Sequence, residues 1–285
     1  MLINTGYSIQ SLEYIAHRGA SSLAPENTVS SVLLAWQLDA DAVEIDVYLT
    51  RDNRIAVIHD KNTQRVSGVD LEVSESSLAK LQELDVGRWK DKKYTGEKIP
   101  SLEDIITTIP KGKKLFVEIK CNREILPFLD NVLSQSGKRS QITLICFNLD
   151  VLAEAKKQMP DVPAYWLVGT EKNKTTNKQI PHNPVLLDKV RQNKIDGLNV
   201  NYAGINKPFA KAVRNSGQVL YAWTVDEPKT AQRMIQLGIT GIMTNCPRWL
   251  KEQLQKDPVS ETQRKKTPCA VIEKENQNNS NENKP

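Results

Sequence analysis

The stretch Ala42-Val43-Glu44-Ile45-Asp46-Val47 decides the fold, because it has the apolar content of a buried β-strand and yet contains two acids. Side chains alternate between the two faces of a strand, so Glu44 and Asp46 share one face. Val43, Ile45 and Val47 share the other face. A second run, Leu115–Lys120, carries Glu118 in the same way. Both runs predict strands buried on both faces, as in a parallel sheet, with charged groups gathered on one side.

Outward from this strand, short apolar runs alternate with segments of helical period along most of the chain. The strand candidates are Tyr14–His17, Ala42–Leu49, Ile55–His59, Leu115–Lys120, Ile142–Phe147, Ala164–Val168, Gly197–Asn201, Val219–Val225 and Gly241–Thr244. Helical patterns such as Ser30–Leu38, Leu102–Thr107 and Pro228–Leu237 lie between most of them. Such repeated strand–helix units predict an α/β fold, specifically a (β/α)8 TIM-type barrel. Nine strand candidates are one more than this barrel needs.

The surplus strand is Ile55–His59, which is separated from the preceding candidate by little more than the four-residue loop Thr50–Asn53. A parallel crossover needs about a dozen residues or more, so this strand is expected to run antiparallel to its predecessor. The loop would pair Leu49 with Arg54 and set His59 opposite Glu44, with both side chains on one face.

The length of the chain suits one barrel domain, which we expect to span residues 1–250. Residues 62–100 are polar, irregular and long for a barrel connection, so we expect a small inserted cap after the third strand. Residues 251–285 are rich in Asn, Gln, Lys and Glu, which predicts a disordered C-terminal tail.

The composition, 39% hydrophobic and 26% charged, is that of an ordinary globular protein. The net charge of +5 arises from scattered lysines and arginines that acids nearly match, so nucleic-acid binding is not predicted. No run approaches the roughly 20 apolar residues of a membrane helix, so no integral membrane association is expected. Four cysteines, Cys121, Cys146, Cys246 and Cys269, lie far apart and predict reduced thiols in a cytoplasmic protein.

The acids Glu44, Asp46 and Glu118 require compensation, because a buried carboxylate is unfavourable unless it is paired or bound to a cation. Ligands that are all oxygens favour one hard divalent cation, Mg²⁺ or Ca²⁺, without separating the two. The structural alternative is a buried ion pair with Lys120 or Arg18.

Two of the three histidines, His17 and His59, stand at the ends of strands, and the C-terminal ends of barrel strands form the active face. Two imidazoles that titrate near neutrality can accept and return a proton, which predicts general acid–base catalysis. The third histidine, His182, stands in a polar loop between prolines and is expected to be exposed.

Three further side chains complete the candidate site. Arg18 follows His17, and its guanidinium has the geometry to clamp phosphate oxygens. Lys120 would point toward the same place as Glu118 and neutralise negative charge. Trp223 ends an apolar strand and could contact a bound ligand, although a core tryptophan is the commoner role.

Taken in order, these motifs resemble those of the glycerophosphodiester phosphodiesterase family, of the bacterial cytoplasmic type, over residues 13–250. The motifs that carry the likeness are His17-Arg18-Gly19-Ala20, Pro25-Glu26-Asn27-Thr28, Val43-Glu44-Ile45-Asp46-Val47, Thr50-Arg51-Asp52, His59-Asp60, Ile99-Pro100-Ser101-Leu102, Glu118-Ile119-Lys120, Trp223-Thr224-Val225 and Gly241-Ile242-Met243-Thr244-Asn245-Cys246-Pro247. Three positions depart from the usual pattern: Asp39 where glycine is often found, Cys146 where serine is common, and Asp226 where asparagine is frequent. None of them removes a catalytic group.

The resemblance implies metal-dependent hydrolysis of a small glycerophosphodiester to glycerol 3-phosphate and an alcohol. It implies a divalent cation on Glu44, Asp46 and Glu118, and it makes His17 and His59 the acid–base pair. Arg18 and Lys120 match the phosphate-contacting positions.

Two other functions fit the same barrel. A lysophospholipase D-like activity would need an apolar groove in residues 62–100, which contain few apolar residues. An inactive phosphate-binding barrel would be expected to have lost a histidine or an acid, and all five are present. The head group, the order in which the two histidines act, the route through water or a cyclic phosphate, and the oligomeric state stay open at the level of the sequence.

Overall fold

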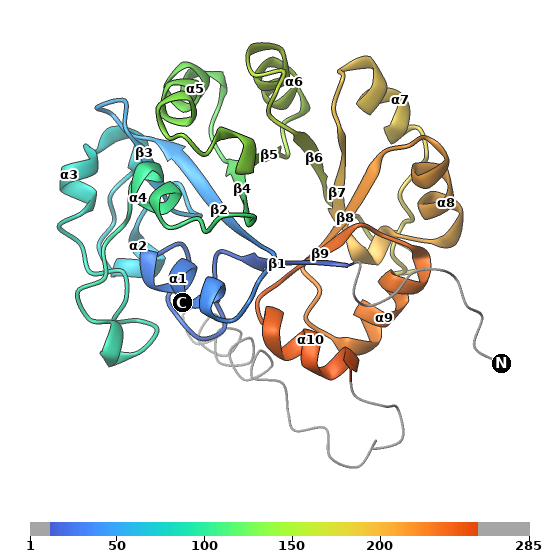
Figure 1. The fold of residues 1–285 in the computed structure, drawn as a ribbon, viewed down its shortest axis with the longest axis horizontal. Coiled ribbons are helices and arrows are strands. Elements are labelled where there is room, and N and C mark those ends of the chain that lie inside the picture. The colour runs from blue at the N-terminus through green and yellow to red at the C-terminus, as the bar shows by residue number, and fades with distance from the viewer. Residues whose placement is uncertain (1–11, 256–285) are drawn as a thin grey trace.

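The computed structural model describes residues 12–255, in which eight parallel strands close into a barrel with helices on its outside (Figure 1). Neighbouring strands follow the order β1-β9-β8-β7-β6-β5-β4-β2, and the pairing of β1 with β2 closes the ring. The barrel strands are β1 (Glu13–His17), β2 (Ala42–Leu49), β4 (Lys114–Ile119), β5 (Ile142–Cys146), β6 (Ala164–Val168), β7 (Gly197–Asn201), β8 (Val219–Trp223) and β9 (Gly241–Thr244). The predicted (β/α)8 barrel is therefore confirmed.

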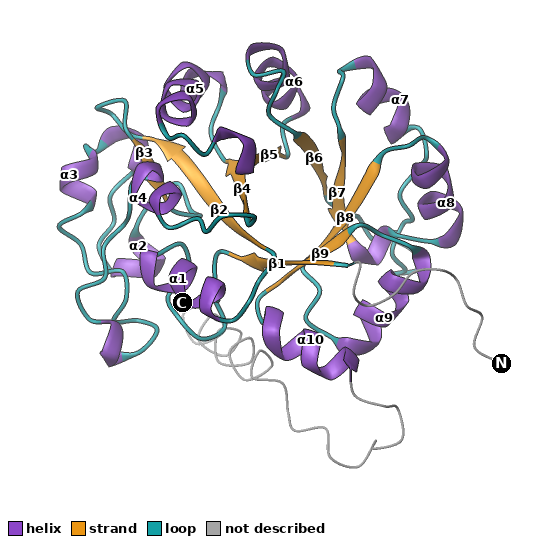
Figure 2. Ribbon diagram, viewed as in Figure 1, coloured by secondary structure: helices purple, strands orange, loops and turns teal. Residues whose placement is uncertain are grey.

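Helices cover the outer face of the ring between successive strands (Figure 2). They are α1 (Val29–Gln37), α2 (Gln64–Ser67), α3 (Leu78–Leu81), α4 (Leu102–Thr107), α5 (Leu126–Gln135), α6 (Leu149–Gln158), α7 (Leu186–Gln192), α8 (Lys207–Asn215), α9 (Pro228–Leu237) and α10 (Pro247–Gln255). Short 3-10 helices are η2 (Val73–Glu75), η3 (Lys92–Tyr94), η4 (Arg123–Ile125), η5 (Arg139–Gln141) and η6 (Tyr202–Gly204). Local sequence sets the helix ends: a capping box of Thr28 and Ser31 begins α1, and Gly238, with a φ of 71°, ends α9.

The surplus strand, β3 (Ile55–Val57), pairs antiparallel with the last three residues of β2. The predicted direction is confirmed, but the predicted register is wrong by one residue, because Leu49 pairs with Ile55 rather than with Arg54. The physical reason is a three-residue hairpin loop, whose last residue, Asn53, takes the left-handed φ of 58° that such loops favour.

His59 reaches the barrel mouth without the predicted strand pairing. β3 ends at Val57, and Ile58 N donates to Asp46 O at 3.0 Å. The chain therefore leaves the hairpin beside β2, and His59 arrives near the acids from an irregular segment rather than from a paired strand position.

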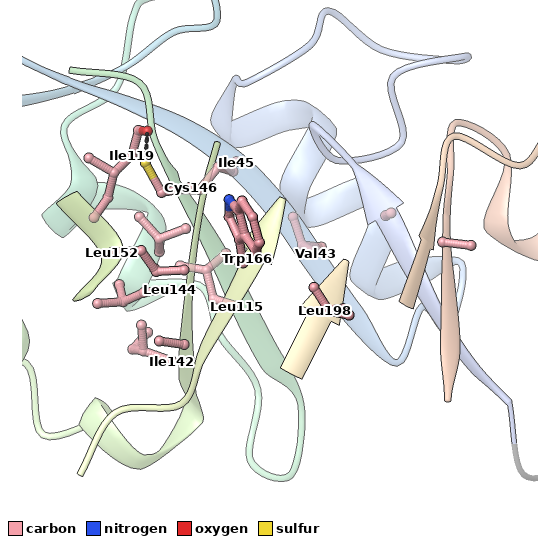
Figure 3. Packing of buried hydrophobic residues seen from close by; sticks show 14 of the residues in the cluster. Val43, Ile45, Leu115, Ile119, Ile142, Leu144, Cys146, Leu152, Trp166 and Leu198 are labelled. Atoms are coloured by element: carbon pink, nitrogen blue, oxygen red, sulfur yellow. Dashed lines mark hydrogen bonds between the residues drawn. The ribbon is translucent and has the colours of Figure 1, made fainter. Parts of the chain in front are cut away.

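Successive side chains of the barrel strands point alternately outward and inward, so they form two apolar layers. Outward-facing residues such as Leu115 share a cluster with helix residues such as Leu152 (Figure 3). Inside the ring a smaller cluster closes the lumen, with the rings of Phe116 and Tyr221 5.4 Å apart and Tyr165 stacked on Tyr221. Since the acids of β2 and β4 alternate with the outward-facing residues, they point into the lumen above this aromatic floor.

Residues 62–100, where an inserted cap is expected, lie to one side of the barrel and have a small apolar core (Figure 1). This core joins Val66, Val73, Leu81 and Ile99 to Ile58, which follows β3. The segment is thereby packed against the part of the chain that leads into His59.

The first residues of the predicted polar tail, 251–255, are helical. α10 continues to Gln255 because Leu250 and Leu254, one turn apart, are both buried. The rest of the predicted tail, including Cys269, lies outside the described residues. Among residues 12–255, no helix is long and apolar enough to cross a membrane.

Candidate active site

Three buried carboxylates, here called the acid cluster, converge in the barrel wall formed by β2 and β4. Glu44, Asp46 and Glu118 are 1%, 0% and 8% exposed, and one oxygen of each lies within 4.8 Å of the other two. β2 and β4 pair in parallel with Asp46 beside Glu118, so both strands present their acids on the same inner face. The alternating acids of the sequence are the direct cause of this cluster.

The acid cluster is electrostatically incomplete. Burial, together with the charges of Asp46 and Glu118, raises the pKa of Glu44 well above its ordinary value. Burial and Asp46 likewise raise the pKa of Glu118 to about 7. Glu44 Oε1 and Asp46 Oδ1 are buried and have no hydrogen-bond partner. Orphaned oxygens in a set of three acids fit a hard cation with oxygen ligands.

The predicted alternative, a buried ion pair, is also present but does not neutralise the acid cluster. Lys120 Nζ lies 2.8 Å from Glu118 Oε1 and 3.6 Å from Asp46 Oδ1. Arg18 Nε lies 3.2 Å from Asp46 Oδ2, while Arg18 Nη1 is 3.0 Å from Glu26 Oε1. Two basic side chains thus face three acids, and one of them, Arg18, also pairs with a fourth acid, Glu26.

The loop after β1 supplies donors to two of the acids. Arg18 N donates to Glu44 Oε2 at 2.9 Å, and Asn27 Nδ2 donates to Asp46 Oδ2 at 2.8 Å. Gly19 makes the loop possible, because its φ is 79° and an added Cβ would lie 2.6 Å from a main-chain carbon of α1. The loop therefore fixes the acids as well as carrying Arg18.

His17 ends β1 and is held by the loop after β9. Its Nδ1 lies 2.8 Å from Asn245 Oδ1, and its Nε2 lies 4.0 Å from Glu44 Oε2. Burial, followed by the charge of Arg18, lowers the pKa of His17 to about 4. The imidazole is consequently neutral at pH 7 and borders the acid cluster.

His59 is held by a chain of ion pairs, here called the rim chain, formed by Asp60, Arg65 and Glu26. His59 Nδ1 lies 2.6 Å from Asp60 Oδ1, and Asp60 Oδ2 accepts from Arg65 Nε at 2.6 Å. Arg65 also donates to both oxygens of Glu26, at 2.9 and 2.8 Å. Because Arg65 belongs to α2 and Glu26 to the loop after β1, the rim chain ties residues 62–100 to the barrel beside His59.

A cavity of about 170 Å³ opens between these groups. Its charged side contains both histidines, and its apolar side contains Phe147 and Trp223, whose rings meet edge to face at 5.5 Å. Trp223 Nε1 donates to Asn199 O at 3.2 Å, which fixes the indole in the wall. The cavity therefore offers a charged surface facing an aromatic one.

The structure brings the predicted site residues together. His17, Arg18, Glu44, His59, Glu118, Lys120 and Trp223 line the cavity, and Asp46 is buried beside them. Their roles stay predictions. The exposed position predicted for His182 is wrong: the side chain is buried, Nε2 donates to Asn201 O at 2.9 Å, and the ring packs on Phe209.

Five residues with a place in the site were not predicted as site residues. They are Glu26, Asp60, Arg65, Asp226 and Asn245, and each contacts a predicted residue or a partner of one. Asp60 adjoins a predicted histidine, and Glu26 and Asn245 stand in recognisable motifs, so a signal for these three exists. The contact of Arg65 with Glu26 and that of Asp226 with Asn245 appear only when segments that are separate in sequence meet.

Comparison with known proteins agrees with this geometry. A family model described as the glycerophosphoryl diester phosphodiesterase family matches residues 17–248. The chain is 29% identical over 249 residues to a glycerophosphodiester phosphodiesterase of Caldanaerobacter subterraneus, covering 85% of this chain and 97% of the relative. It is 25% identical over 250 residues to one of Bacillus subtilis, covering 82% and 83%.

Solved structures show the same likeness. A phosphodiesterase from Oleispira antarctica, solved in complex with the product sn-glycerol-3-phosphate, superposes with a TM-score of 0.78 at 26% identity. The match covers 86% of this chain and 97% of that one. A glycerophosphodiester phosphodiesterase from Thermotoga maritima superposes with a TM-score of 0.67, also at 26% identity, over 85% and 98% of the two chains.

Proposed function

Because this chain belongs to the glycerophosphoryl diester phosphodiesterase family, we propose that it hydrolyses glycerophosphodiesters to glycerol 3-phosphate and an alcohol. One observation carries the proposal: two histidines, two basic side chains and the acid cluster, in which Glu44 and Asp46 each have an orphaned oxygen, meet at a single cavity. This set offers proton transfer, charge neutralisation and cation binding at one place.

The acid cluster is the proposed binding site for one divalent cation, Mg²⁺ or Ca²⁺. Glu44, Asp46 and Glu118 supply only oxygen ligands, and the orphaned oxygens of Glu44 and Asp46 account for part of this ligand set. When bound, such a cation draws negative charge from the phosphoryl oxygens of a phosphodiester.

Arg18 and Lys120 have a different task, which is to hold the phosphate group. Both side chains line the cavity, and both are already anchored on carboxylates that fix their direction. A guanidinium and an ammonium placed in advance stabilise the charge that develops on the phosphoryl oxygens without reorganising during the reaction.

The two histidines carry the proton transfers. In the reaction a new P–O bond forms to the attacking oxygen, and the P–O bond to the alcohol breaks. One imidazole accepts the proton of the attacking hydroxyl, and the other donates a proton to the departing alcohol oxygen, so the charges balance. The same two transfers serve attack by water and attack by the neighbouring glycerol hydroxyl followed by hydrolysis of a cyclic phosphate.

The dimensions of the cavity favour deacylated substrates over lysophospholipids. Its volume of about 170 Å³ is below the roughly 300–1,000 Å³ of pockets that enclose drug-sized ligands. The apolar side, which includes Phe147 and Trp223, offers aromatic surface to a glycerol backbone. Trp223 is accordingly proposed to contact the glycerol moiety.

The test is the release of glycerol 3-phosphate from glycerophosphocholine by protein stripped of metal, assayed with Mg²⁺, with Ca²⁺ and with excess chelator. We expect release with a cation, none with chelator, and much lower turnover of lysophosphatidylcholine. Absence of release with either cation, from protein shown to be folded by circular dichroism, would contradict the proposal. Faster turnover of lysophosphatidylcholine would replace it with the lysophospholipase D-like activity.

A further inference from the structure

Outside the cavity, one stretch of the inserted residues combines positive charge with aromatic rings. The stretch Arg88-Trp89-Lys90-Asp91-Lys92-Lys93-Tyr94, here called the basic-aromatic segment, contains four basic residues and one acid. Its two aromatic rings have lysine ammonium groups 5.7 and 4.9 Å from their centroids. Four of its long side chains are exposed, those of Arg88, Trp89, Lys92 and Lys93. The segment therefore presents basic and aromatic groups to the outside together.

The basic-aromatic segment packs on the loop after β1. Lys90 Nζ donates to Ser21 O at 2.7 Å, and the hydroxyl of Tyr94 donates to Leu23 O at 3.0 Å. These contacts hold the segment against Leu23, whose side chain is 46% exposed. A surplus of positive charge thus lies directly beside an exposed aliphatic side chain.

An apolar groove adjoins the same loop and shares Leu23 with this contact. Its volume is about 370 Å³, and it lies between the loop after β1, the end of α1 and the start of α10. The charged groups at its edge, Arg248 and Glu252, pair with each other at 3.0 Å. The apolar part of the lining consists of Ala20, Leu23, Leu38, Cys246, Pro247 and Trp249.

We propose that the basic-aromatic segment, Leu23 and the groove form one face that binds the surface of an anionic phospholipid bilayer. The positive charges complement the phosphate groups of anionic lipids, and each basic side chain near such a surface adds to the attraction. Tryptophan and tyrosine favour the boundary between head groups and acyl chains, and exposed aliphatic groups insert beside them. A nucleic acid would match the charge but would leave Leu23 and the groove in water.

Bilayer binding does not depend on the proposed function. Neither the basic-aromatic segment nor Leu23 is among the residues that line the cavity. Glycerophosphocholine is a soluble substrate, so its turnover requires no bilayer. Binding and turnover therefore test different claims about the protein.

The test is co-sedimentation of the full-length protein with two kinds of vesicle, one of phosphatidylcholine alone and one of equal parts phosphatidylcholine and phosphatidylglycerol. At low salt, we expect the partition coefficient for the mixed vesicles to be at least about 10-fold higher. We expect binding to weaken as the salt concentration approaches about 1 M, where the Debye length is only about 3 Å.

Charge reversal at two exposed lysines locates the binding face. We expect Lys92→Glu/Lys93→Glu to lower the partition coefficient for the mixed vesicles by at least about 10-fold, with turnover of glycerophosphocholine unchanged. Lys172→Glu/Lys174→Glu is the matched control, because these lysines are exposed in the loop after β6 and the double change alters the net charge equally. Its partition coefficient should stay within about 2-fold of the wild type.

Removal of the aliphatic side chain tests the apolar part of the face. We expect Leu23→Ser to weaken vesicle binding by about 5- to 10-fold, because less apolar surface leaves water. Ile180→Ser is the matched control, since Ile180 is 44% exposed in the loop after β6. It should bind as the wild type, and circular dichroism checks that both variants are folded.

The outcomes separate the binding face from the proposed function. Equal binding to both kinds of vesicle, or equal loss in the two lysine variants, would overturn the face. Vesicle binding that Leu23→Ser leaves unchanged would overturn it too, as would binding to double-stranded DNA without binding to vesicles. A protein that binds the mixed vesicles as expected but hydrolyses no glycerophosphodiester leaves the face standing and removes the proposed function.

Discussion

Glu44 of the acid cluster and Glu26 of the rim chain belong to one site, yet their surroundings act on them in opposite directions. Burial and two neighbouring acids raise the pKa of Glu44. Burial also acts on Glu26, but hydrogen bonds and charge from Arg65 and Arg18 outweigh it and lower the pKa of Glu26 to about 2. The barrel wall therefore holds more acids than its neighbouring basic side chains neutralise, whereas the acids of the rim are fully paired.

This difference indicates where a ligand binds and where geometry is set. Buried polar groups are normally paired, so unpaired ones mark a place where function takes precedence over stability. The rim chain has alternating charge from Asp60 through Arg65 to Glu26, and it needs nothing from outside. We interpret the acid cluster as the place that binds the cation and the rim chain as the frame that orients His59 and Arg18.

Glu44→Gln should have the largest effect of the changes that test this comparison. We expect cation-stimulated turnover to fall by about 10³-fold or more, because an amide weakens the ligand set and its electrostatic contribution. In chelator, the variant should unfold at the same temperature as the wild type or a higher one, since one buried like charge is removed. Activity and thermal unfolding are measured on the same preparations.

Glu171→Gln is the matched control for this change, because Glu171 is exposed in the loop after β6. It should alter neither property. A Glu44→Gln protein that keeps full cation-stimulated activity would contradict the assignment of the acid cluster.

Arg65→Ala tests the other region and should have a smaller effect. Loss of the guanidinium frees Asp60 and Glu26, so His59 and Arg18 lose orientation while the acid cluster stays intact. We expect kcat to fall by roughly 10- to 100-fold, as for small misplacement of catalytic groups, with little change in the cation concentration for half-maximal activity. Arg65→Lys should not restore kcat, because an ammonium cannot bridge two carboxylates as a planar fork does.

Arg88→Ala is the control within the same segment, since Arg88 is an exposed arginine between α3 and η3. It should behave as the wild type. If Arg65→Ala weakened cation activation as strongly as Glu44→Gln does, the distinction between the two regions would be lost.

The acid cluster could be predicted from the sequence because its pattern is local. Glu44 and Asp46 stand at alternate positions of one apolar strand, and Glu118 stands in another, so strand periodicity and the rules of barrels bring them together. The same reasoning found His17, which ends a barrel strand. It placed His59 near the acids with a register that is wrong by one residue, since loop length alone does not reveal a left-handed Asn53.

The supporting groups could not be predicted in the same way, because their partners are distant in sequence. Arg65 meets Glu26 across 39 positions, and Asn245 meets His17 across 228. A hydrophilic residue in a loop gives no sign of its partner before the loop is folded. His182 illustrates the converse case, in which a polar loop residue turns out to be buried against Phe209.

The smallest expected effect is on the free energy of unfolding. As pH rises, Glu118 of the acid cluster should lower this free energy and Glu26 of the rim chain should raise it. Glu118 has a folded-state pKa of about 7 against an ordinary 4.5, so in chelator it should lower the free energy of unfolding as pH rises from 4.5 to 7. Glu26 has a folded-state pKa of about 2, so it stabilises above 4.5 and loses that contribution as pH falls toward 2. Urea unfolding of Glu118→Gln and Glu26→Gln, each subtracted from the wild type, isolates the two pH windows from the contribution of His17. The pKa of His17 is lowered to about 4, so His17 makes the free energy of unfolding rise with pH between about 4 and 6.5. We expect each difference to be on the order of 1 kcal/mol or more, confined to its own window, and the Glu118 difference to vanish when a divalent cation is added. The comparison would fail if the two variants differed from the wild type in the same pH range. It would also fail if a divalent cation left the Glu118 difference unchanged.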